Sequence, residues 1–587
     1  MSISLLFNGN PSVLGRKWYE KTADTRDCLA ISQFFNLSPF IGKLLATRNL
    51  TPETVADYLN PTIKKLMPDP SHLKDMDKGI NRVIEAIQAQ QKIAVFGDYD
   101  VDGATSSALF KRYFHDIGLD LTVYIPQRIE EGYGPNIPAL TQLKQQGHSL
   151  VIMVDCGTTA FEALAHAKTI GLDVIIIDHH ISAPLMPEVV ALINPNRLDE
   201  SSPLTTLCAA ALSFVFLVAL HRRLRQLQWF TSKSEPDLRQ YLDLVALGTV
   251  CDVMPLTHLN RAFVTQGLKV IHHRSNIGLK ALADIAGIDE SPSAYHLGFM
   301  LGPRINAGGR VGKASFGSRL LASRDAIEAQ HLAQELNLLN QERQEIELIV
   351  LEQALEQIQQ KRLDEHPLIL VGNENWHVGV IGIVAGRLKE RFQKPVCVVG
   401  FDADIGKGSG RSITGVNLGS AMHLACQKGL LVSGGGHAMA AGFTVMKNQF
   451  LSFQEFLCTH FAEEVANVEP RIDLDAVLSP MAATVDFLKE LSLLEPYGAG
   501  NPTPRFCLHK VKLTGIERVG VNHLRAFAYG EDGTRLKVMA FRSFETELGT
   551  QMLRLQGQSV ALAGTLKLDK WNGREQVTFF LDDVMEL

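Results

Sequence analysis

The sequence predicts an α/β protein whose main domain is built on a parallel sheet. Short apolar runs alternate with helix-like stretches, and three of these runs are 93–96, 149–154 and 173–177. Continuous apolar strands separated by helices are typical of a parallel sheet covered on both faces. Asp98, Asp155 and Asp178 each follow the end of one run. Because ligands of such sheets bind beyond the carboxyl ends of the strands, this edge is the predicted site.

The length of 587 residues is too great for one core and predicts several domains. A hydrophobic content of 46%, a charged content of 20% and a net charge of −6 describe an ordinary soluble protein. This balance neither indicates nor excludes nucleic-acid binding, since a local basic groove can lie on an acidic protein. The predicted divisions are an N-terminal segment 1–70, a parallel-sheet domain 71–320, a connecting helix 321–366, a second α/β domain 367–466 and a small barrel 467–587.

Cysteines and apolar stretches predict a cytoplasmic protein that does not enter a membrane. The eight cysteines are scattered without a Cys-x-x-Cys pair, which argues against a zinc finger and favours a reducing compartment. The N-terminal residues lack the pattern of a signal peptide. One apolar run, Leu204–Leu220, is slightly short for a membrane span and stands alone, so a buried core helix is predicted.

The first predicted strand is followed by three aspartates, Asp98, Asp100 and Asp102, at every second position. Two is the strand period, so the three carboxylates are predicted to share one side where the strand frays into a loop. Two carboxylates about 4 Å apart repel by roughly 4 kcal/mol at an effective dielectric constant near 20. Three of them at a partly buried strand end therefore need cations. The alternative is an acidic turn in solvent, which the apolar strand before it and the helix start after it disfavour.

Other strand ends add ligands of the same kind. Asp155 closes the second run, Asp178-His179-His180 closes the third, and Asp252 closes an apolar run at 244–251. Carboxylates and an imidazole without thiolates suit Mn²⁺ or Mg²⁺. Two such ions bridged by a shared carboxylate would activate water and stabilise the leaving oxygen of a phosphate ester. In this hypothesis Asp155 or Asp100 bridges the ions.

The residues next to His179 are given supporting roles in the same hypothesis. His180 is predicted to face the phosphate or to protonate the leaving group. Asp178 is predicted to orient its neighbours. For any one histidine the alternative is a hydrogen bond in the core, and only the convergence of several strand ends favours the site.

Two glycine-rich stretches contain arginines suited to binding phosphate. Residues 302–312 are predicted as a loop with Arg304, Asn306 and Arg310, which acts either as a flexible connector or as a phosphate-binding loop. A long helix over 322–365 leads to a second domain, where Ser409, Arg411 and the run Gly434–His437 have the chemistry of an anion site. Tight packing also requires glycine, so this run alone is weak evidence.

The last part of the chain predicts a small barrel of the OB type. Five strand-like segments separated by turns lie within 505–581, and about five antiparallel strands suit that fold. Lysines and arginines such as Lys537 and Arg535 interleave with aromatic residues such as Phe527 and Phe541. Basic residues beside aromatic platforms suit single-stranded nucleic acid. The alternative is ordinary strand packing with the lysines outward.

The combined motifs resemble the DHH family of phosphoesterases. The resemblance rests on Asp178-His179-His180, on the segment Gly97–Gly103, and on Asp155 and Asp252. The second α/β domain, with Gly434–His437, resembles the DHHA1 domain of that family, and the likeness covers nearly the whole chain. In one position the chain departs from the pattern, because Phe96 stands where smaller members often have a histidine. We expect Asp98 to replace that ligand.

The length, the arginine stretch and the barrel are similar to the members of this family that degrade single-stranded DNA. The resemblance implies hydrolysis from the 5′ end to 5′-mononucleotides, with two Mn²⁺ or Mg²⁺ ions, in DNA repair and recombination. The implied metal ligands are Asp98, Asp100, Asp102, Asp155, His179 and Asp252. The implied DNA contacts are Arg304, Asn306, Arg310, Ser409, Arg411, Gly435, Gly436 and His437. The implied partners are single-stranded DNA, a single-strand-binding protein and a helicase, and a monomer is expected.

Two other functions fit parts of the sequence. A phosphoesterase acting on pyrophosphate or short oligonucleotides would use the same acidic cluster, but the chain length and the basic, aromatic barrel speak against it. A catalytically inactive scaffold that binds DNA would use the barrel, but it has no reason to keep so many repelling carboxylates.

Overall fold

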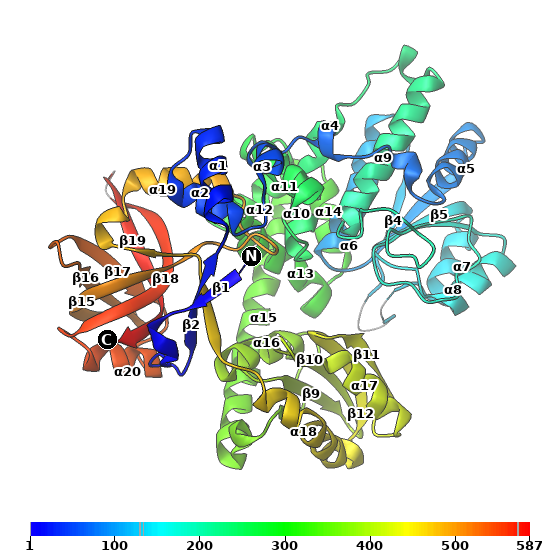
Figure 1. Cartoon of the computed structure of the whole chain (residues 1–587). Helices are drawn as coiled ribbons and strands as arrows, with labels where there is room; N and C mark the ends of the chain where they lie inside the picture. Colours follow the sequence, from blue (N-terminus) through cyan, green and yellow to red (C-terminus); the bar gives the residue numbers. More distant parts are fainter. Residues whose placement is uncertain (1, 128–130, 133, 572–573) are drawn as a thin grey trace.

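The computed structural model describes residues 2–127, 131–132, 134–571 and 574–587. Within these ranges the chain forms two α/β units joined by one long helix, and a β-barrel beside which the N-terminal segment lies (Figure 1). The predicted fold class is confirmed. The domain limits given above stay a prediction.

The first α/β unit contains the predicted parallel sheet. In spatial order its strands are β4 (Thr122–Tyr124), β3 (Lys92–Gly97), β5 (His148–Val154), β6 (Asp173–Ile177) and β7 (Ala191–Ile193). All four pairings are parallel. The three-residue strand β7 was not predicted, because so short an apolar run gives almost no signal.

Helices cover both faces of this sheet, as the continuous apolar strands predict. Along β3, Ile93 and Val95 join the core formed with α5 (Met76–Gln88), α6 (Val101–Asp116) and α9 (Ala209–Gln226). The alternate residues Ala94 and Phe96 join the opposite core with α7 (Ile137–Gln145) and α8 (Phe161–Thr169). The apolar run 204–220 lies largely in α9 and is buried, so the predicted core helix is confirmed. Among the helices described, none combines the length and apolar character needed to cross a bilayer.

A group of helices follows the sheet. They are α10 (Leu242–Cys251), α11 (His258–His272), α12 (Ile277–Ile285), the π-helix His296–Leu301, α13 (Gly302–Val311) and α14 (Ser315–Ala322). The prediction of a loop at 302–312 was therefore wrong. Its glycines allow close packing instead, since a Cβ atom on Gly309 would lie 2.8 Å from the ring of Tyr99.

The long helix α15 (Ala326–Lys361) links the two α/β units (Figure 1). Asp325 caps it by accepting hydrogen bonds from the N–H groups of Ile327 and Glu328. Leu332 and Leu336 near its start belong to the core of the first unit, whereas Ala354 and Ile358 near its end belong to the second. The predicted connecting helix is confirmed, and it is shared by both cores.

The second α/β unit has a mixed sheet. Its strands, in spatial order, are β11 (Ser433–His437), β12 (Ala440–Met446), β10 (Ile405–Arg411), β9 (Val396–Asp402) and β8 (Ile369–Glu374). Only β8 and β9 pair in parallel. One face packs on α16 (Ile381–Phe392), and the other packs on α17 (Leu418–Gln427) and α18 (Phe450–Ala466).

The C-terminal barrel closes through pairing of its first and fourth strands. Its strands are β15 (Arg505–Val519), β16 (His523–Tyr529), β17 (Arg535–Ala540), β18 (Ser559–Trp571) and β19 (Arg574–Glu586), and β15 pairs with β18. The expectation of purely antiparallel strands was wrong, because β17 pairs with β19 in parallel. Helix α20 (Glu547–Arg554) and β18 lie between these two strands in sequence and supply the crossover that a parallel pair needs.

The N-terminal segment packs on the barrel rather than forming a core of its own. Strand β2 (Lys17–Thr22) pairs with β1 (Ser2–Leu5) on one side and with β13 (Arg471–Leu474) on the other. Trp18 is fully buried there, and its indole N–H donates to the Asp583 carboxylate at 3.2 Å. Helices α1 (Thr25–Phe35), α2 (Pro39–Ala46) and α3 (Pro52–Leu59) contribute to the barrel core.

Candidate metal centre and nucleic-acid interface

The three N-terminal aspartates of the site are arranged by a helix start rather than by a strand. Strand β3 ends at Gly97, Asp100 is the N-cap of α6, and Asp102 lies in the first turn of that helix. Asp100 accepts hydrogen bonds from the N–H groups of Asp102 at 2.9 Å and Gly103 at 3.1 Å. The prediction that the strand period places the three carboxylates on one side of a fraying strand was therefore wrong, because Asp100 and Asp102 belong to the start of a helix. Asp98 and Asp100 nonetheless come together in one group of candidate metal ligands, and Asp102 belongs to a second group.

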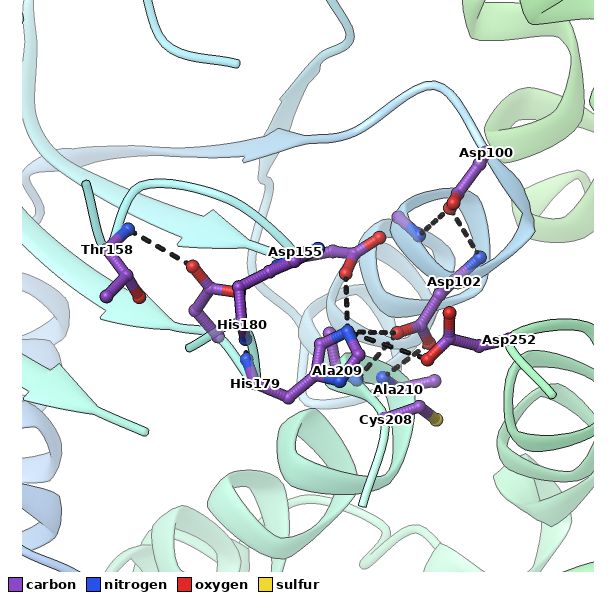
Figure 2. Close-up of polar contacts among 12 residues, drawn as sticks. Asp100, Asp102, Asp155, Thr158, His179, His180, Cys208, Ala209, Ala210 and Asp252 are labelled. Carbon is purple, nitrogen blue, oxygen red and sulfur yellow. Dashed lines mark hydrogen bonds and ion pairs between the residues drawn. The ribbon is translucent and has the colours of Figure 1, made fainter. Parts of the chain in front are cut away.

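A second helix start holds Asp102. Its carboxylate accepts hydrogen bonds from the N–H groups of Ala209 at 2.6 Å and Ala210 at 2.9 Å, at the beginning of α9 (Figure 2). The positive end of a helix dipole stabilises a carboxylate in this position. Packing around it is close, since a Cβ atom on Gly248 would lie 2.9 Å from Asp102 Oδ1. Asp102 is 1% exposed and has little freedom to move.

His179 lies at the centre of the acidic side chains (Figure 2). Its Nε2 atom is 3.3 Å from Asp155 Oδ1, 3.5 Å from Asp252 Oδ2 and 3.8 Å from Asp102 Oδ2. Both His179 Nε2 and Asp252 Oδ2 are buried atoms that make no hydrogen bond within the described residues. Three carboxylates thus lie within 3.8 Å of one imidazole nitrogen, an arrangement of buried polar atoms that a bound cation would satisfy.

Three groups of side chains have ligand atoms within 4.8 Å of one another. They are Asp98 with Asp100 and Asp155, Asp102 with His179 and Asp252, and Asp155 with His179 and His180. Asp155 occurs in two of these groups and connects them. Carboxylate oxygens with imidazole fit Mn²⁺ or Mg²⁺, and within the described residues these groups contain no thiolate of the kind that structural zinc favours.

Behind the cluster, Asp178 fixes the turn that carries both histidines. Its buried carboxylate accepts hydrogen bonds from the N–H groups of Thr158 at 3.1 Å, His179 at 2.8 Å and His180 at 3.2 Å. It also binds His180 Nδ1 at 2.7 Å. Burial opposes its charge, but these hydrogen bonds hold the pKa of Asp178 well below its usual range.

The contact with Asp178 also changes the pKa of His180. Burial disfavours the imidazolium form, but the hydrogen bond and charge of Asp178 outweigh that effect and raise the pKa of His180 to about 9. Since Nδ1 is engaged, Nε2 is the ring atom able to serve a metal ion or a substrate. The predicted orienting contact from Asp178 to its neighbours is present in the structure.

Sequence reasoning missed several groups that shape the site. Thr158 holds Asp178, and the side-chain amide of Asn194 donates to the His180 carbonyl at 2.8 Å. The backbone N–H groups of Ala209 and Ala210 carry no side-chain signal at all. Asn194 follows β7, so recognition of that short strand would have marked it as another strand-end residue.

The acidic cluster is electrostatically strained without cations. Burial and the repulsion of Asp102 and Asp100 raise the pKa of Asp252 to about 9. Burial and the same neighbouring carboxylates raise the pKa of Asp155 well above its usual value. Protonation is one way to relieve this repulsion and cation binding is another, so protons and metal ions compete for the site.

Metal binding is therefore expected to release protons at neutral pH. Because the pKa values of Asp155 and Asp252 are raised, apparent affinity for Mn²⁺ should increase as the pH rises from 6 toward about 9. Calorimetric titration with MnCl₂ in buffers of different ionisation enthalpy measures the protons released. Proton release that is absent at pH 7, with an affinity independent of pH, would contradict the raised pKa values.

The predicted DNA-binding residues of the first unit lie on α13. Arg304 donates from Nε to the Asn337 side chain at 3.0 Å and from Nη1 to the Met300 carbonyl at 2.7 Å. Arg310 donates from Nη1 to the Gly379 carbonyl of the second unit at 2.8 Å. Asn306 is half-buried on the same helix. These residues belong to a helix instead of a loop, and of the three Arg310 is the one with a described contact to the second unit.

The predicted DNA-binding residues of the second unit lie on β10 and β11. In register across the sheet, Ser409 lies opposite Gly442 and Gly442 lies opposite Gly435. A Cβ atom on Gly435 or Gly442 would meet nothing within 4 Å, so this part of the sheet is an open floor. Arg411 stands beside it and donates to Ser409 Oγ at 3.1 Å.

The remaining members of this group lie at the end of β11. Gly436 has a φ of +148°, and a Cβ atom there would lie 2.3 Å from the Ala440 carbonyl, so glycine is required. The adjacent His437 is exposed. A Cβ atom on Gly382 would lie 3.0 Å from Ser409 Oγ, and Gly382 follows the Gly379 turn that Arg310 contacts. The two groups of predicted DNA contacts thus approach each other at this turn.

Three domain families match the chain in the order found in the structure. They are the N-terminal domain of the DHH family over residues 92–249, the DHHA1 domain over 365–463 and the RecJ OB domain over 474–583. Together with the acidic cluster, these matches place the molecule in the class of DHH phosphoesterases.

Similar proteins that align over nearly the whole chain indicate which family of DHH phosphoesterases the chain belongs to. The chain is 35% identical to a single-stranded-DNA-specific exonuclease RecJ of Salmonella typhimurium, with 94% of this chain and 96% of the relative covered. It is 32% identical to RecJ of Bacillus subtilis, covering 97% and 70% respectively. A crystal structure of RecJ with Mn²⁺ from Thermus thermophilus matches with a TM-score of 0.81 and 29% identity, covering 97% of this chain and 79% of that one. The chain belongs to the RecJ family of single-stranded-DNA-specific exonucleases.

Proposed function

We propose that this protein is a single-stranded-DNA-specific exonuclease that hydrolyses phosphodiester bonds from the 5′ end and releases 5′-mononucleotides, in DNA repair and recombination. The single observation that supports this most strongly is the close approach of three carboxylates to His179 Nε2 at the carboxyl edge of the sheet. The direction of cleavage and the biological setting are supported by family membership alone.

We assign the ligands to two sets and infer that Asp155 contributes to both, because its carboxylate lies 3.3 Å from His179 Nε2 of the second set. Asp98, Asp100 and Asp155 would hold one divalent ion. Asp102, His179 and Asp252 would hold the other. When bound, Mn²⁺ or Mg²⁺ ions supply an activated water and stabilise the leaving oxygen.

Two side chains of the protein have further roles in the proposed reaction, one in positioning a metal ligand and one in donating a proton. Asp178 fixes the backbone of the turn, so that His179 keeps its place among the carboxylates. His180 carries a proton over the neutral pH range because its pKa is raised to about 9. We assign to it contact with the phosphate and transfer of that proton to the leaving oxygen.

DNA would enter along the junction of the two α/β units. We propose that Arg304, Asn306 and Arg310 on α13 contact phosphates from one side. On the other side, the open surface of the second unit at Gly435 and Gly442 allows the DNA backbone to approach the sheet. The proposed contacts to DNA on this side are Ser409, Arg411, Gly435, Gly436 and His437. Arginine suits this task because its guanidinium can bind a phosphate through two hydrogen bonds.

Replacement of Arg411 by alanine is expected to weaken binding of single-stranded DNA about ten-fold. Loss of one phosphate contact should also reduce the slope of log K against log salt by about 0.7. Fluorescence anisotropy of a labelled oligonucleotide at several salt concentrations measures both effects. Arg391→Ala, on the helix α16 of the same unit, is the matched control and should leave the slope unchanged. An unchanged slope in the Arg411 variant would argue against the contact.

Purified protein, 5′-labelled single-stranded DNA and MnCl₂ test the whole proposal. Labelled mononucleotide should appear first, and duplex DNA of the same sequence should stay intact. Binding without release of nucleotide would favour the inactive scaffold. Cleavage of dinucleotides or pyrophosphate together with poor cleavage of long strands would favour the small-substrate phosphoesterase.

The remaining expectations complete the proposal. We propose that the protein acts as a monomer in the cytoplasm, and that a single-strand-binding protein and a helicase supply its substrate. We also propose the domain limits 1–70, 71–320, 321–366, 367–466 and 467–587. Size-exclusion chromatography with light scattering tests the monomer directly.

A further inference from the structure

Two aromatic rings of the first α/β unit, those of Tyr295 and Phe299, are exposed to solvent. Tyr295 lies immediately before the π-helix His296–Leu301, and Phe299 lies within it. Their rings stack with centroids 5.1 Å apart and an angle of 27° between the planes. Tyr295 is 58% exposed and Phe299 is 71% exposed. Two large rings held together in water indicate a contact surface, and π-helical turns recur at functional sites.

The π-helix that carries these rings packs on α10, the helix that leads to the metal ligand Asp252. In this contact Cys251 Sγ donates to the Leu297 carbonyl at 3.4 Å. A Cβ atom on Gly302, at the end of the π-helix, would lie 2.6 Å from Cys251 Sγ. Cys251 directly precedes the ligand Asp252, and α13 with Arg304 continues from Gly302. The π-helix that carries the rings therefore packs on the helix that leads to a metal ligand and continues into the helix that carries an assigned phosphate contact.

The same line of side chains continues onto the barrel. Lys567 of β18 has its Nζ atom 5.7 Å from the centroid of the Tyr295 ring and 4.8 Å from that of Phe580. Phe580 stacks on Phe541 with centroids 5.1 Å apart and 16° between the planes. Phe541 is 52% exposed. We call Phe299, Tyr295, Lys567, Phe580 and Phe541 the aromatic track.

We propose that the aromatic track binds unpaired bases of the substrate strand between the barrel and the metal site. This inference deepens the proposed function and rests on it. Stacking on aromatic faces tolerates any base, whereas the bases of a duplex are already stacked on one another and cannot bind in this way. Lys567 lies where it can bind the phosphate between two stacked bases. The track thus selects unpaired strands that are long enough to reach from the metal site to the barrel.

The arrangement favours nucleic acid over a protein partner. A protein-binding patch is an apolar area with a polar rim, whereas here a lysine contacts an aromatic ring on each of two domains. The track also begins at the π-helix, which packs on the helix that leads to Asp252 and continues into the helix that carries Arg304.

The double variant Tyr295→Ala/Phe299→Ala tests the proposal kinetically. For an oligothymidylate of about 20 nucleotides we expect KM to rise about ten-fold, with kcat changed less than about two-fold. For a dinucleotide, which does not extend to the track, KM should stay within about two-fold. Phe34→Ala removes a comparably exposed ring, 76% exposed, on α1 away from the track and is the matched control. Tyr295→Phe/Phe299→Tyr should restore KM, because it retains both rings.

Fluorescence reports stacking without any need for turnover. A 2-aminopurine base moved stepwise along the oligonucleotide should be quenched at particular positions by the wild-type protein with Ca²⁺. In the double alanine variant the quenching should be lost at the positions nearest the metal site. Unchanged quenching and an unchanged KM for the long strand would overturn the track. An equal rise in KM for the dinucleotide would overturn it too. Failure of the wild-type protein to release nucleotides would instead contradict the proposed function.

Discussion

Replacement of Asp155 by alanine is expected to reduce hydrolysis of single-stranded DNA by about a thousand-fold, or about 4 kcal/mol in the barrier. The carboxylate connects the two groups of candidate ligands and lies 3.3 Å from His179 Nε2, so its loss disorganises both. DNA binding should be retained, because a carboxylate repels phosphate. Release of labelled mononucleotide and anisotropy binding measure the two quantities on the same protein.

A matched control for this variant is Asp243→Asn. Asp243 is also a buried acid with a raised pKa, of about 6 because of burial, but it lies at the opposite end of α10 from Asp252. Its replacement should leave hydrolysis within about two-fold of wild type. Wild-type turnover by Asp155→Ala would remove Asp155 from the site, whereas a large loss in the control would indicate that any change to a buried acid is disruptive.

Replacement of Asp178 by alanine is expected to lower activity about a hundred-fold and stability by about 3 kcal/mol. The buried carboxylate accepts hydrogen bonds from Thr158, His179 and His180, and all of these donors lose their partner together. Urea unfolding measures the stability, and kcat with Mn²⁺ measures the chemistry. Retention of both values would contradict the role of Asp178 in fixing the turn.

The variant Asp178→Asn separates the effect of losing the carboxylate charge from the effect of losing the packing of the side chain. The amide keeps much of the packing but no longer stabilises the imidazolium of His180, so the pKa of His180 should fall from about 9 toward its ordinary value. If His180 supplies a proton, the alkaline limb of the pH–rate profile should move to lower pH. An unmoved limb would show that His180 is not the group that titrates.

The part of the site that sequence reasoning predicted is the part fixed by strand ends. Asp155 and Asp178 follow apolar runs, and a parallel sheet brings such ends to one edge whatever their separation in the chain. The aspartate triplet was recognised with the wrong geometry. A spacing of two fits a strand, but Asp100 caps a helix, and capping depends on backbone N–H groups that a sequence does not display.

The parts that were missed depend on contacts between distant segments. Glycines in 302–312 suggest a loop, yet they allow a helix to approach Tyr99 and the long helix. Tyr295 and Phe299, four residues apart, have the spacing of an ordinary buried helix face, and only the structure shows them exposed. The parallel pair β17–β19 follows from an intervening helix that the strand pattern did not reveal.

The pairing of β2 with β13 has a consequence for biosynthesis. Trp18 donates to a carboxylate 565 residues further along the chain. At a translation rate of about 5–20 residues per second, the ribosome needs roughly half a minute or longer to deliver that acceptor. During that interval the segment exposes apolar side chains, and one edge of β2 stays unpaired until β13 has been synthesised. We therefore expect the nascent chain to depend on chaperone protection of this segment until the barrel has been synthesised.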